Sequence, residues 1–459
     1  MQPAPLTRGK EASLTLQRLV HGLRKAIPKR RFRLLPAGAE PTAANLLISR
    51  GLRAFGDGLV SILLPAYLAT LGFDAFEIGT LSTATLAGSA VLTLAVGIVA
   101  HRFSRRALLT AAAVLMIATG IVFAAVHDFW PLLLIAFVGT LNPSSGDVSV
   151  FLPLEHAQLA QNVTDRGRTA LFARYSLIGS LAGAVGALAA GAPDFLRDAI
   201  GLEMKQALQA AFLLYASLGL AAVLLYRRLP SDAPDANRVS AQPLRRSRSI
   251  VLTLAALFSL DAFAGGFVVQ SLLALWLFQR FGLSLAATGA IFFWTGVLSA
   301  ASYLVAVRIS QQIGLINTMV FTHLPSSLCL VLIPFMPSVA PAIVLLLIRS
   351  ALSQMDVPTR TSYVMAVVTP EERAAAASIT AVPRSLAAAA SPVLAGALLA
   401  VSSFGWPLII AGGLKIIYDL LLLATFRSVR PPEEHGGGRN DMSVGDDRTG
   451  NDARVSWWR

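Results

Sequence analysis

Residues 341–367 read PAIVLLLIRSALSQMDVPTRTSYVMAV, a stretch long enough as a helix to cross a hydrocarbon layer about 30 Å thick. It is interrupted by Arg349, Asp356 and Arg360, whose spacing puts them on one face of a helix. A charge near the middle of a bilayer costs about 2.5–3.5 kcal/mol, so this face must contact water or other polar groups. The stretch therefore predicts a membrane-spanning helix with one polar side.

Similar apolar stretches recur along the chain of 459 residues, of which 55% are hydrophobic and only 14% charged. Soluble domains carry about 25% charged residues. The stretches predict twelve spans, namely 46–71, 78–100, 107–126, 131–159, 169–192, 206–226, 250–278, 285–307, 314–336, 341–367, 374–402 and 405–427. A β-barrel would show segments of about ten residues in which hydrophobic and polar positions alternate, and the sequence shows no such segments. The predicted fold class is therefore an all-α polytopic membrane protein.

Positive charges are distributed unevenly over the loops between these spans. Arginines gather in alternate loops, such as HRFSRR at 101–106, whereas FDAFE at 73–77 and HDFWP at 127–131 hold no lysine or arginine. The positive-inside rule then predicts that both termini are cytoplasmic. This distribution accounts for the net charge of +13, so we expect no nucleic-acid partner. The Ala- and Arg-rich composition is typical of a bacterial inner (plasma) membrane protein, and we expect a monomer.

The second half of the chain repeats landmarks of the first half about 205–210 positions later. The repeated pairs include Gly58 with Gly266, Asp147 with Asp356, Arg168 with Arg373, and Gly191 with Gly396. They predict two six-helix bundles, 46–226 and 250–427, around a central cavity and joined by a cytoplasmic linker over 227–249. The tail over 428–459 is predicted to be disordered. The basic tail over 1–45 is predicted to be either an interfacial helix or a disordered segment.

Two six-helix halves in the same orientation are a transporter architecture, and residues 46–427 resemble the major facilitator superfamily. That family carries G-x-x-x-D-R-x-G-R-R between its second and third spans. The stretch GIVAHRFSRR supplies Gly97, Arg102, Arg105 and Arg106 at the matching positions. It departs from the family at His101, where aspartate is usual, and at Ser104, where glycine is usual. The resemblance implies alternating access, with the three arginines at a gate.

Ionisable residues concentrate in the first, fourth, seventh and tenth spans, which in that family line the central cavity. The candidates for substrate or proton binding are Asp57, Asp261, Arg349, Arg53, Asp147 and Asp356. The first three of these lie nearest to mid-depth, where secondary transporters place their substrate and ion sites. Asp147 and Asp356 lie deeper toward the cytoplasm, and a gate or a helix-pinning ion pair is an equally good interpretation for them.

Further arginines near the cytoplasmic side are candidate gate residues. The full set of candidates is Arg102, Arg105, Arg106, Arg360, Arg168, Arg373 and Arg384. For Arg384 a packing role is equally plausible. Lys415 and Asp419 are spaced as an i,i+4 pair on the last span and are predicted to be structural. Glu155 is expected to reach the cytoplasmic interface.

The sequence therefore predicts a secondary active transporter of a small solute, coupled to protons through a carboxylate such as Asp57 or Asp261, with efflux by antiport favoured. The mixed charge of the candidate site favours an organic anion or zwitterion. No ATP-binding P-loop and no H-E-x-x-H motif is present, so we expect no cofactor, no metal and no enzyme activity; besides the solute, membrane lipid is the expected partner. Two alternatives remain, a polytopic enzyme acting on lipid and a solute receptor that has lost transport.

Overall fold

The computed structural model describes residues 35, 40, 42–100, 102–144, 149–161, 165–230, 247–369 and 372–427, with side chains left out at 160–169 and 374. Within these ranges the regular structure is helical, and eleven helices or helix pairs are long and apolar enough to cross a membrane. An all-α polytopic membrane protein is therefore confirmed. The predicted disorder of 428–459, the two interpretations of the basic tail and most of the linker fall outside the described residues.

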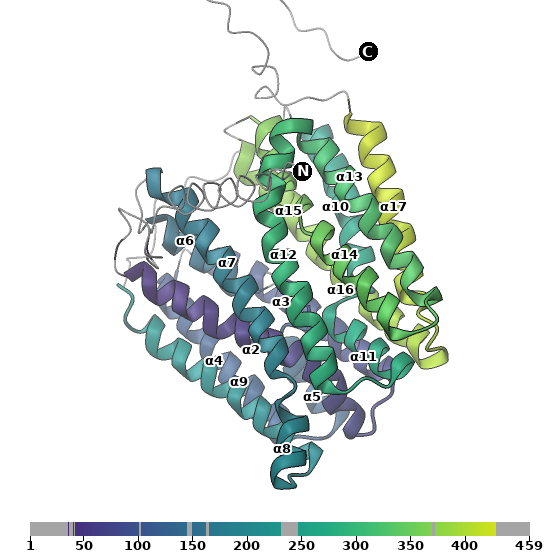
Figure 1. The fold of residues 1–459 in the computed structure, drawn as a ribbon. Helices are drawn as coiled ribbons and strands as arrows, with labels where there is room; N and C mark the ends of the chain where they lie inside the picture. The colour runs from purple at the N-terminus through teal and green to yellow at the C-terminus, as the bar shows by residue number, and fades with distance from the viewer. Residues whose placement is uncertain are drawn as a thin grey trace, which may run out of the picture.

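The first bundle holds the helices up to residue 226. They are α2 (Thr42–Thr70), α3 (Ala75–Val99), α4 (Arg105–Ala125), α5 (Phe129–Val138), α6 (Phe151–Gln161), α7 (Asp165–Ala189), α8 (Ala192–Ile200) and α9 (Met204–Tyr226). The helix α2 crosses the whole bundle (Figure 1). We call the two ends of the molecule the Thr42 end and the Thr70 end, after the first and last residues of α2.

The second bundle holds the helices from residue 248 onward. They are α10 (Arg248–Gly266), α11 (Gln270–Phe281), α12 (Leu285–Ile313), α13 (Leu315–Leu332), the short 3-10 helix η1 (Ile333–Phe335), α14 (Val339–Ser353), α15 (Asp356–Val367), α16 (Arg373–Val401) and α17 (Trp406–Phe426). Figure 1 shows this bundle beside the first one, and near the Thr70 end α11 packs against α2 and α3 while α12 contacts α8.

The fourth predicted span, 131–159, is wrong as a single helix, because α5 ends at Val138 and α6 begins at Phe151. Pro143 has no backbone N–H and disfavours a helical conformation at Asn142 before it. The backbone N–H and the hydroxyl of Ser144 donate to Asn142 Oδ1 at 3.0 and 2.7 Å, which stabilises a turn in place of a helix. The local hydrogen bonds of this segment therefore compete successfully with a continuous span.

The seventh and tenth spans are also interrupted, at 267–269 and at 354–355. In the tenth span Pro358 lies in the first turn of α15, where its missing N–H is tolerated. In a continuous helix the ring of Pro358 would instead clash with the carbonyl of Gln354. The polar stretch that follows Arg349 thus begins a new helix at Asp356.

The internal repeat is visible in how the helices pack inside each bundle. The helix α2 packs on α7 as α10 packs on α16, and α4 packs on α9 as α13 packs on α17. Glycine permits the close crossing in both halves. A Cβ atom on Gly58 would lie 2.0 Å from the carbonyl oxygen of Gly183, and one on Gly266 would lie 2.3 Å from that of Ala388. The packing is therefore consistent with two structural repeats.

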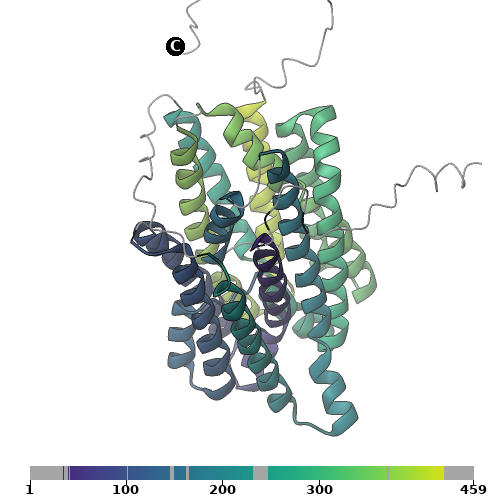
Figure 2. The same ribbon diagram turned by 90° about the vertical axis from the view of Figure 1, so that its left-hand side faces the viewer.

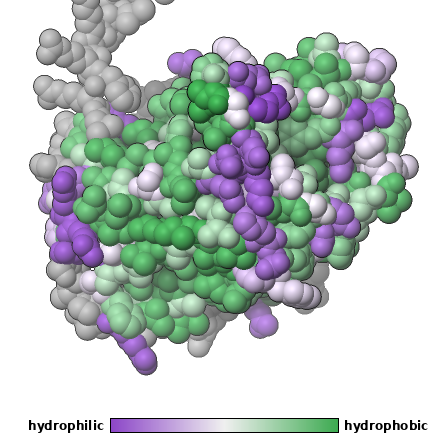
Figure 3. Space-filling model, turned by 90° about the horizontal axis from the view of Figure 1, so that it is seen from below, coloured by the Kyte–Doolittle hydropathy of each residue, from purple (hydrophilic) through white to green (hydrophobic). Residues whose placement is uncertain are grey.

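The two bundles meet through α3 against α16 and α7 against α12. Near the Thr70 end, Gly79 and Gly396 bring α3 and α16 so close that a Cβ atom on either glycine would lie 2.8 Å from the Cα atom of the other. Hydrogen bonds between the bundles lie at this end too. They run from Ser271 N to Pro143 O (3.0 Å), from Ala286 N to Asp194 Oδ2 (2.9 Å) and from Val393 N to Thr83 Oγ1 (2.9 Å). Figure 3 views this end from below, with hydrophobic surface around groups of polar residues.

Toward the Thr42 end the same two helices lose this close packing. Side chains over 91–98 of α3 and 381–387 of α16 are exposed or half-buried, and a Cβ atom on Gly97 would meet nothing within 4 Å. The perpendicular view in Figure 2 shows both bundles extending along the same axis. The bundles are therefore in close contact at the Thr70 end and less closely packed along α3 and α16 toward the Thr42 end.

Candidate functional site

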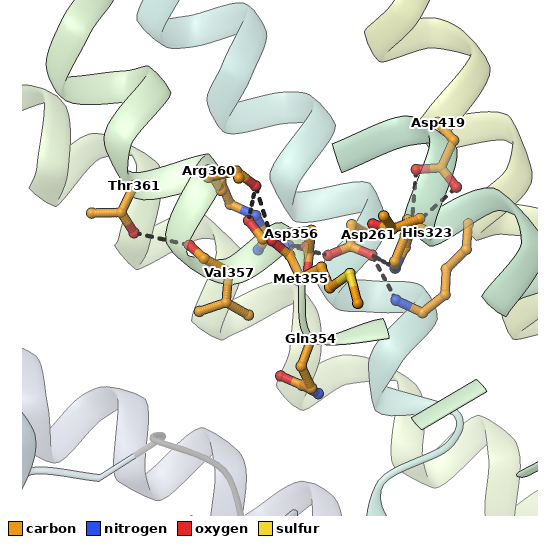
Figure 4. Close-up of polar contacts among 12 residues, drawn as sticks. Asp261, His323, Gln354, Met355, Asp356, Val357, Arg360, Thr361 and Asp419 are labelled. Carbon is orange, nitrogen blue, oxygen red and sulfur yellow. Dashed lines mark hydrogen bonds and ion pairs between the residues drawn. The ribbon is translucent and has the colours of Figure 1, made fainter. Parts of the chain in front are cut away.

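Six ionisable side chains from four helices come together inside the second bundle. They are Asp261 on α10, His323 on α13, Asp356 and Arg360 on α15, and Lys415 and Asp419 on α17. We call this set the C-bundle cluster (Figure 4). Each of the six residues is at most 9% exposed. The cluster is consequently shielded from solvent, and its charges must be balanced largely by one another.

Asp261 lies at the centre of the C-bundle cluster and bridges three helices. Its Oδ1 atom accepts a hydrogen bond from Lys415 Nζ at 2.6 Å, and its Oδ2 atom accepts one from Arg360 Nη2 at 3.1 Å. Arg360 also pairs with Asp356 one turn earlier on α15, and its guanidinium lies 5.2 Å from the ring centroid of Phe258. A single carboxylate thus holds α10, α15 and α17 together through two cations.

His323 lies on the other side of Asp261. Its Nδ1 atom is 2.9 and 3.0 Å from the two carboxylate oxygens of Asp419, and its Nε2 atom is 3.8 Å from Asp261 Oδ1. Figure 4 shows His323 between these two carboxylates. Both ring nitrogens therefore face acidic groups.

A second buried cluster joins four helices of the first bundle, which we call the N-bundle cluster. Arg53 pairs with Glu155 and donates from Nε to the hydroxyl of Tyr226 at 3.0 Å. The hydroxyls of Tyr226 and Tyr175 donate to Glu155 at 2.6 and 2.5 Å. The guanidinium of Arg53 also lies 4.0 Å from the ring centroid of Phe151. This network has one cation and one anion, and its carboxylate is well supplied with donors.

The burial of Glu155 corrects the expectation that this residue reaches the cytoplasmic interface, since Glu155 is 0% exposed. Its position on α6 faces Arg53 and the two tyrosines of the N-bundle cluster. The charge-assisted hydrogen bonds of these partners offset the cost of burial. A short polar stretch beside an apolar one cannot by itself reveal that three distant partners surround it.

The candidate residues for substrate or proton binding fall into separate places. Asp261 lies in the C-bundle cluster with Asp356, whereas Arg53 lies in the N-bundle cluster. Asp57 is buried in the first bundle, where it interacts electrostatically with Arg53 and with Tyr215. Asp147 lies outside the described residues. The structure thus groups the candidates by bundle, with Asp57 in the first and Asp261 in the second.

Arg349 lies apart from both clusters, on the half-buried side of α14. The thiol of Cys329 on α13 is its electrostatic neighbour, and Ser326 Oγ donates to the carbonyl oxygen of Arg349 at 3.4 Å. Arg384 on α16 is exposed, yet it is close enough to Arg360, Asp261 and Asp356 to interact with them electrostatically. Arg384 is therefore an exposed cation next to the C-bundle cluster.

The other candidate gate arginines lie at the Thr42 end. Arg106 donates from Nη1 to the carbonyl oxygen of Leu229 at 3.3 Å, and Arg373 donates from Nε to that of Met365 at 3.0 Å. Both acceptors lie near the end of a helix, where a cation is favourable. Arg102 is exposed and Arg105 half-buried. The side chain of Arg168 lies outside the described residues.

Sequence reasoning missed His323 and underrated Lys415 and Asp419 as members of the C-bundle cluster. The i,i+4 spacing of the last two was visible, but it suggested a pair on one helix, whereas each contacts a different helix. His323 is a single histidine in an apolar stretch and carries no spacing signal. Among the described residues, no group of three His, Cys, Asp or Glu side chains could hold a metal ion.

Comparisons with known proteins define the class. Residues 46–355 and 256–444 match the sequence model of the Major Facilitator Superfamily, and the chain belongs to this family. The uncharacterized membrane protein YJR124C of Saccharomyces cerevisiae is 25% identical over 415 residues, which cover 82% of this chain and 92% of the yeast protein.

Solved structures agree with the fold. A point mutant of the nucleoside transporter NupG gives a TM-score of 0.69 at 14% identity and covers 84% of this chain and 100% of its own. A bacterial homolog of the human lysosomal transporter Spinster, in an inward-facing and occupied conformation, gives 0.67 at 14% identity and covers 84% and 96%. The human organic anion transporter MFSD10 gives 0.58 at 18% identity and covers 83% and 100%. Family and fold together support a membrane transporter of a small molecule rather than an enzyme.

Proposed function

We propose that the protein is a secondary active transporter that moves a small solute by alternating access, coupled to protons and favouring efflux by antiport. The exposure of Arg384 is the observation that carries this proposal. Arg384 lies about 16 Å along α16 from Arg373, near the middle of this 29-residue helix. Because the side chain is exposed, a charge at that depth has to contact water rather than lipid. Because α16 packs against α3 of the other bundle, that water has to enter between the bundles.

The packing of the two bundles supports access from one side. At the Thr70 end the contacts of Gly79 with Gly396 and of Asp194 with Ala286 hold the bundles together. Toward the Thr42 end the facing stretches 91–98 and 381–387 are largely accessible. We infer a passage open toward the Thr42 end, which the positive-inside rule makes the cytoplasmic side. Alternating access then requires the contacts at the Thr70 end to separate.

Accessible cations favour an organic anion or zwitterion as the solute. Arg384 is exposed, and Arg349 is half-buried. By contrast, the carboxylates of Asp261 and Asp356 are buried and already paired with cations. A solute that enters between the bundles would therefore meet more positive than negative charge. Arginine suits this role because its planar guanidinium can donate two parallel hydrogen bonds to a carboxylate or phosphate.

The remaining expectations follow from this mechanism. Residues 46–226 and 250–427 would be the two moving units, working as a monomer in a bacterial inner membrane with both termini in the cytoplasm. Arg102, Arg105, Arg106 and Arg373 lie at the Thr42 end, where a gate would form once this end closes. Arg360 would act through the C-bundle cluster, and Arg168 remains a proposed gate residue on the strength of its sequence position.

Flux measurements in liposomes test the proposal. A panel of radiolabelled carboxylates, sugar phosphates and amino acids is offered to reconstituted protein with and without an imposed pH gradient. We expect gradient-dependent flux of at least one solute, lost in Arg384→Ala and partly retained in Arg384→Lys. The matched control is Arg197→Ala, which removes an exposed arginine of α8 that pairs with Asp198.

The same experiment separates the alternatives. Folded wild-type protein that moves no solute, under any gradient, would contradict transport. Turnover of a lipid without flux would indicate an enzyme, and saturable solute binding without flux would indicate a receptor. A solute whose flux is equal in wild type and in Arg384→Ala would place its site away from α16.

A further inference from the structure

His323 is surrounded by acidic groups in a way that favours its doubly protonated form. Both oxygens of Asp419 lie within 3.0 Å of Nδ1, and Asp261 Oδ1 lies 3.8 Å from Nε2. A neutral imidazole has one N–H and one bare nitrogen, so one nitrogen would present a lone pair to a carboxylate. An imidazolium donates from both nitrogens and satisfies both carboxylates at once.

The charges of the C-bundle cluster lead to the same conclusion. Its three carboxylates, Asp261, Asp356 and Asp419, face only two permanent cations within the cluster, Arg360 and Lys415. With a neutral histidine the cluster carries one excess negative charge, and with a protonated histidine it is neutral. Since an unpaired charge at this burial is costly, the buried set favours holding one additional proton.

The other elements around His323 do not supply that missing charge inside the protein. On α17, Tyr418 places its ring centroid 5.9 Å from that of His323. On α16, Arg384 interacts electrostatically with Arg360, Asp261 and Asp356, but its side chain is exposed and forms no ion pair with these carboxylates, which pair with Arg360 and Lys415 instead. On α14, Arg349 has the thiol of Cys329 as its electrostatic neighbour. The proton therefore remains the group that balances the cluster.

We propose that His323 and Asp419 form a proton-binding site buried between α13 and α17, and that this proton is the one coupled to solute movement. The coupling rests on the proposed function, whereas the site itself does not. Asp261 and Arg360 connect the site to Arg384, the exposed cation on the side of the proposed passage. Loss of the proton leaves one of the two carboxylates, Asp261 or Asp419, facing a bare imidazole nitrogen, which destabilises the contacts among α10, α13 and α17. Proton release is thereby linked to the packing of the second bundle.

Nuclear magnetic resonance of protein labelled with ¹⁵N-histidine tests the site without any solute. The chain has six histidines, and the His323 signal is assigned by its loss in His323→Gln. In lipid at neutral pH we expect His323 to show two protonated ring nitrogens. In Asp419→Asn the His323 signal should shift to that of a neutral ring under the same conditions.

A neutral His323 ring in wild-type protein at neutral pH would overturn the site, even if Asp419→Asn proved too unstable to study.

Flux measurements then test the coupling separately, with whichever solute of the panel the wild-type protein transports. His323→Gln should lose the stimulation by a pH gradient and retain exchange of labelled for unlabelled solute, and His127→Gln should behave as wild type. Gradient-driven flux that persists in His323→Gln would overturn the coupling. Absence of flux in wild-type protein with a protonated His323 would contradict the proposed function and leave the proton site standing.

Discussion

Arg53 and Asp261 occupy equivalent positions in the two bundles and carry opposite charges. They are 208 residues apart, the same spacing that separates Gly58 from Gly266. Each lies on the first helix of its bundle and is the centre of a buried ion-pair cluster. Their partners come from corresponding helices, α6 and α9 for Arg53 and α15 and α17 for Asp261. The repeat thus preserves the position of a charged cluster while inverting the charge at its centre.

The two clusters differ in whether the charges of their own side chains cancel. In the N-bundle cluster one arginine and one glutamate cancel, and two tyrosine hydroxyls complete the hydrogen bonds of Glu155. The C-bundle cluster has an odd number of charges and reaches neutrality only with a proton. We infer that the first cluster fixes helices in place, whereas the second can change its charge during transport.

Glu155→Gln is expected to destabilise the protein strongly. Removing the charge leaves Arg53 buried without its paired anion, and breaking a buried pair in this way costs about 3–5 kcal/mol. Thermal unfolding in detergent should show a large fall in melting temperature. The double variant Arg53→Met, Glu155→Gln should lose less than the sum of the two single variants, because it leaves neither member of the pair charged. A melting temperature equal to that of wild type would show that the pair contributes little.

Asp261→Asn is expected to impair both stability and transport, since Arg360 loses one of its two carboxylates and Lys415 loses the carboxylate it contacts. The stability loss should be about 3–5 kcal/mol by the same reasoning. Adding Lys415→Met removes a cation together with the anion and should recover much of the stability. Coupling should remain impaired in the double variant, because His323 still lacks Asp261. Measurement of melting temperature and of gradient-driven flux on the same samples separates these effects, and full recovery of coupled flux would contradict the role of Asp261.

The length and polarity of the apolar stretches were sufficient to predict the spans, because a membrane imposes a minimum helix length. The prediction of one continuous helix over 131–159 was wrong, because the turn at Asn142 and the proline after it determine the local structure. Span prediction averages hydropathy over many residues and therefore overlooks a break that depends on two of them. The same averaging overlooked the interruption of the tenth span before Asp356.

Spacing predicted which ionisable residues share a helix face but not which helix that face contacts. The spacing of Asp356 and Arg360 places them on one helix face, where they do pair, whereas the link from Arg360 to Asp261 depends on how α10 lies relative to α15. The place of His323 depends on the approach of α13 to α17, which no pattern within either helix encodes. Tertiary packing therefore determines the site, and the sequence supplies only its candidates.

Gly79→Val is expected to prevent the close approach of the two bundles at the Thr70 end. A Cβ atom at this position would lie 2.6 Å from the carbonyl oxygen of Pro392 and 2.8 Å from the Cα atom of Gly396. Since both are backbone atoms, α3 and α16 would have to move apart. The rate at which a maleimide labels a cysteine at Ser82, in a Cys329→Ser background, should rise, because Ser82 is fully buried here. Gly97→Val, at a position with open space around it, is the control and should leave this rate unchanged.

Asp194→Ala is expected to loosen the same end by removing a bond between the bundles. Asp194 lies in the first turn of α8 and accepts a hydrogen bond from Ala286 N at 2.9 Å, in the first turn of α12. A carboxylate at a helix N-terminus gains from the unsatisfied N–H groups and from the helix dipole, typically by about 0.3–1 kcal/mol. Without the Asp194 carboxylate, the balance of conformations should shift toward opening at the Thr70 end. The rate at which maleimide labels a cysteine at Ser82 should then rise severalfold. Asp198→Ala removes an equally acidic residue of α8 that pairs locally with Arg197, so its labelling rate should match wild type. If both variants are labelled equally fast, the bond from Asp194 to α12 does not hold the bundles together.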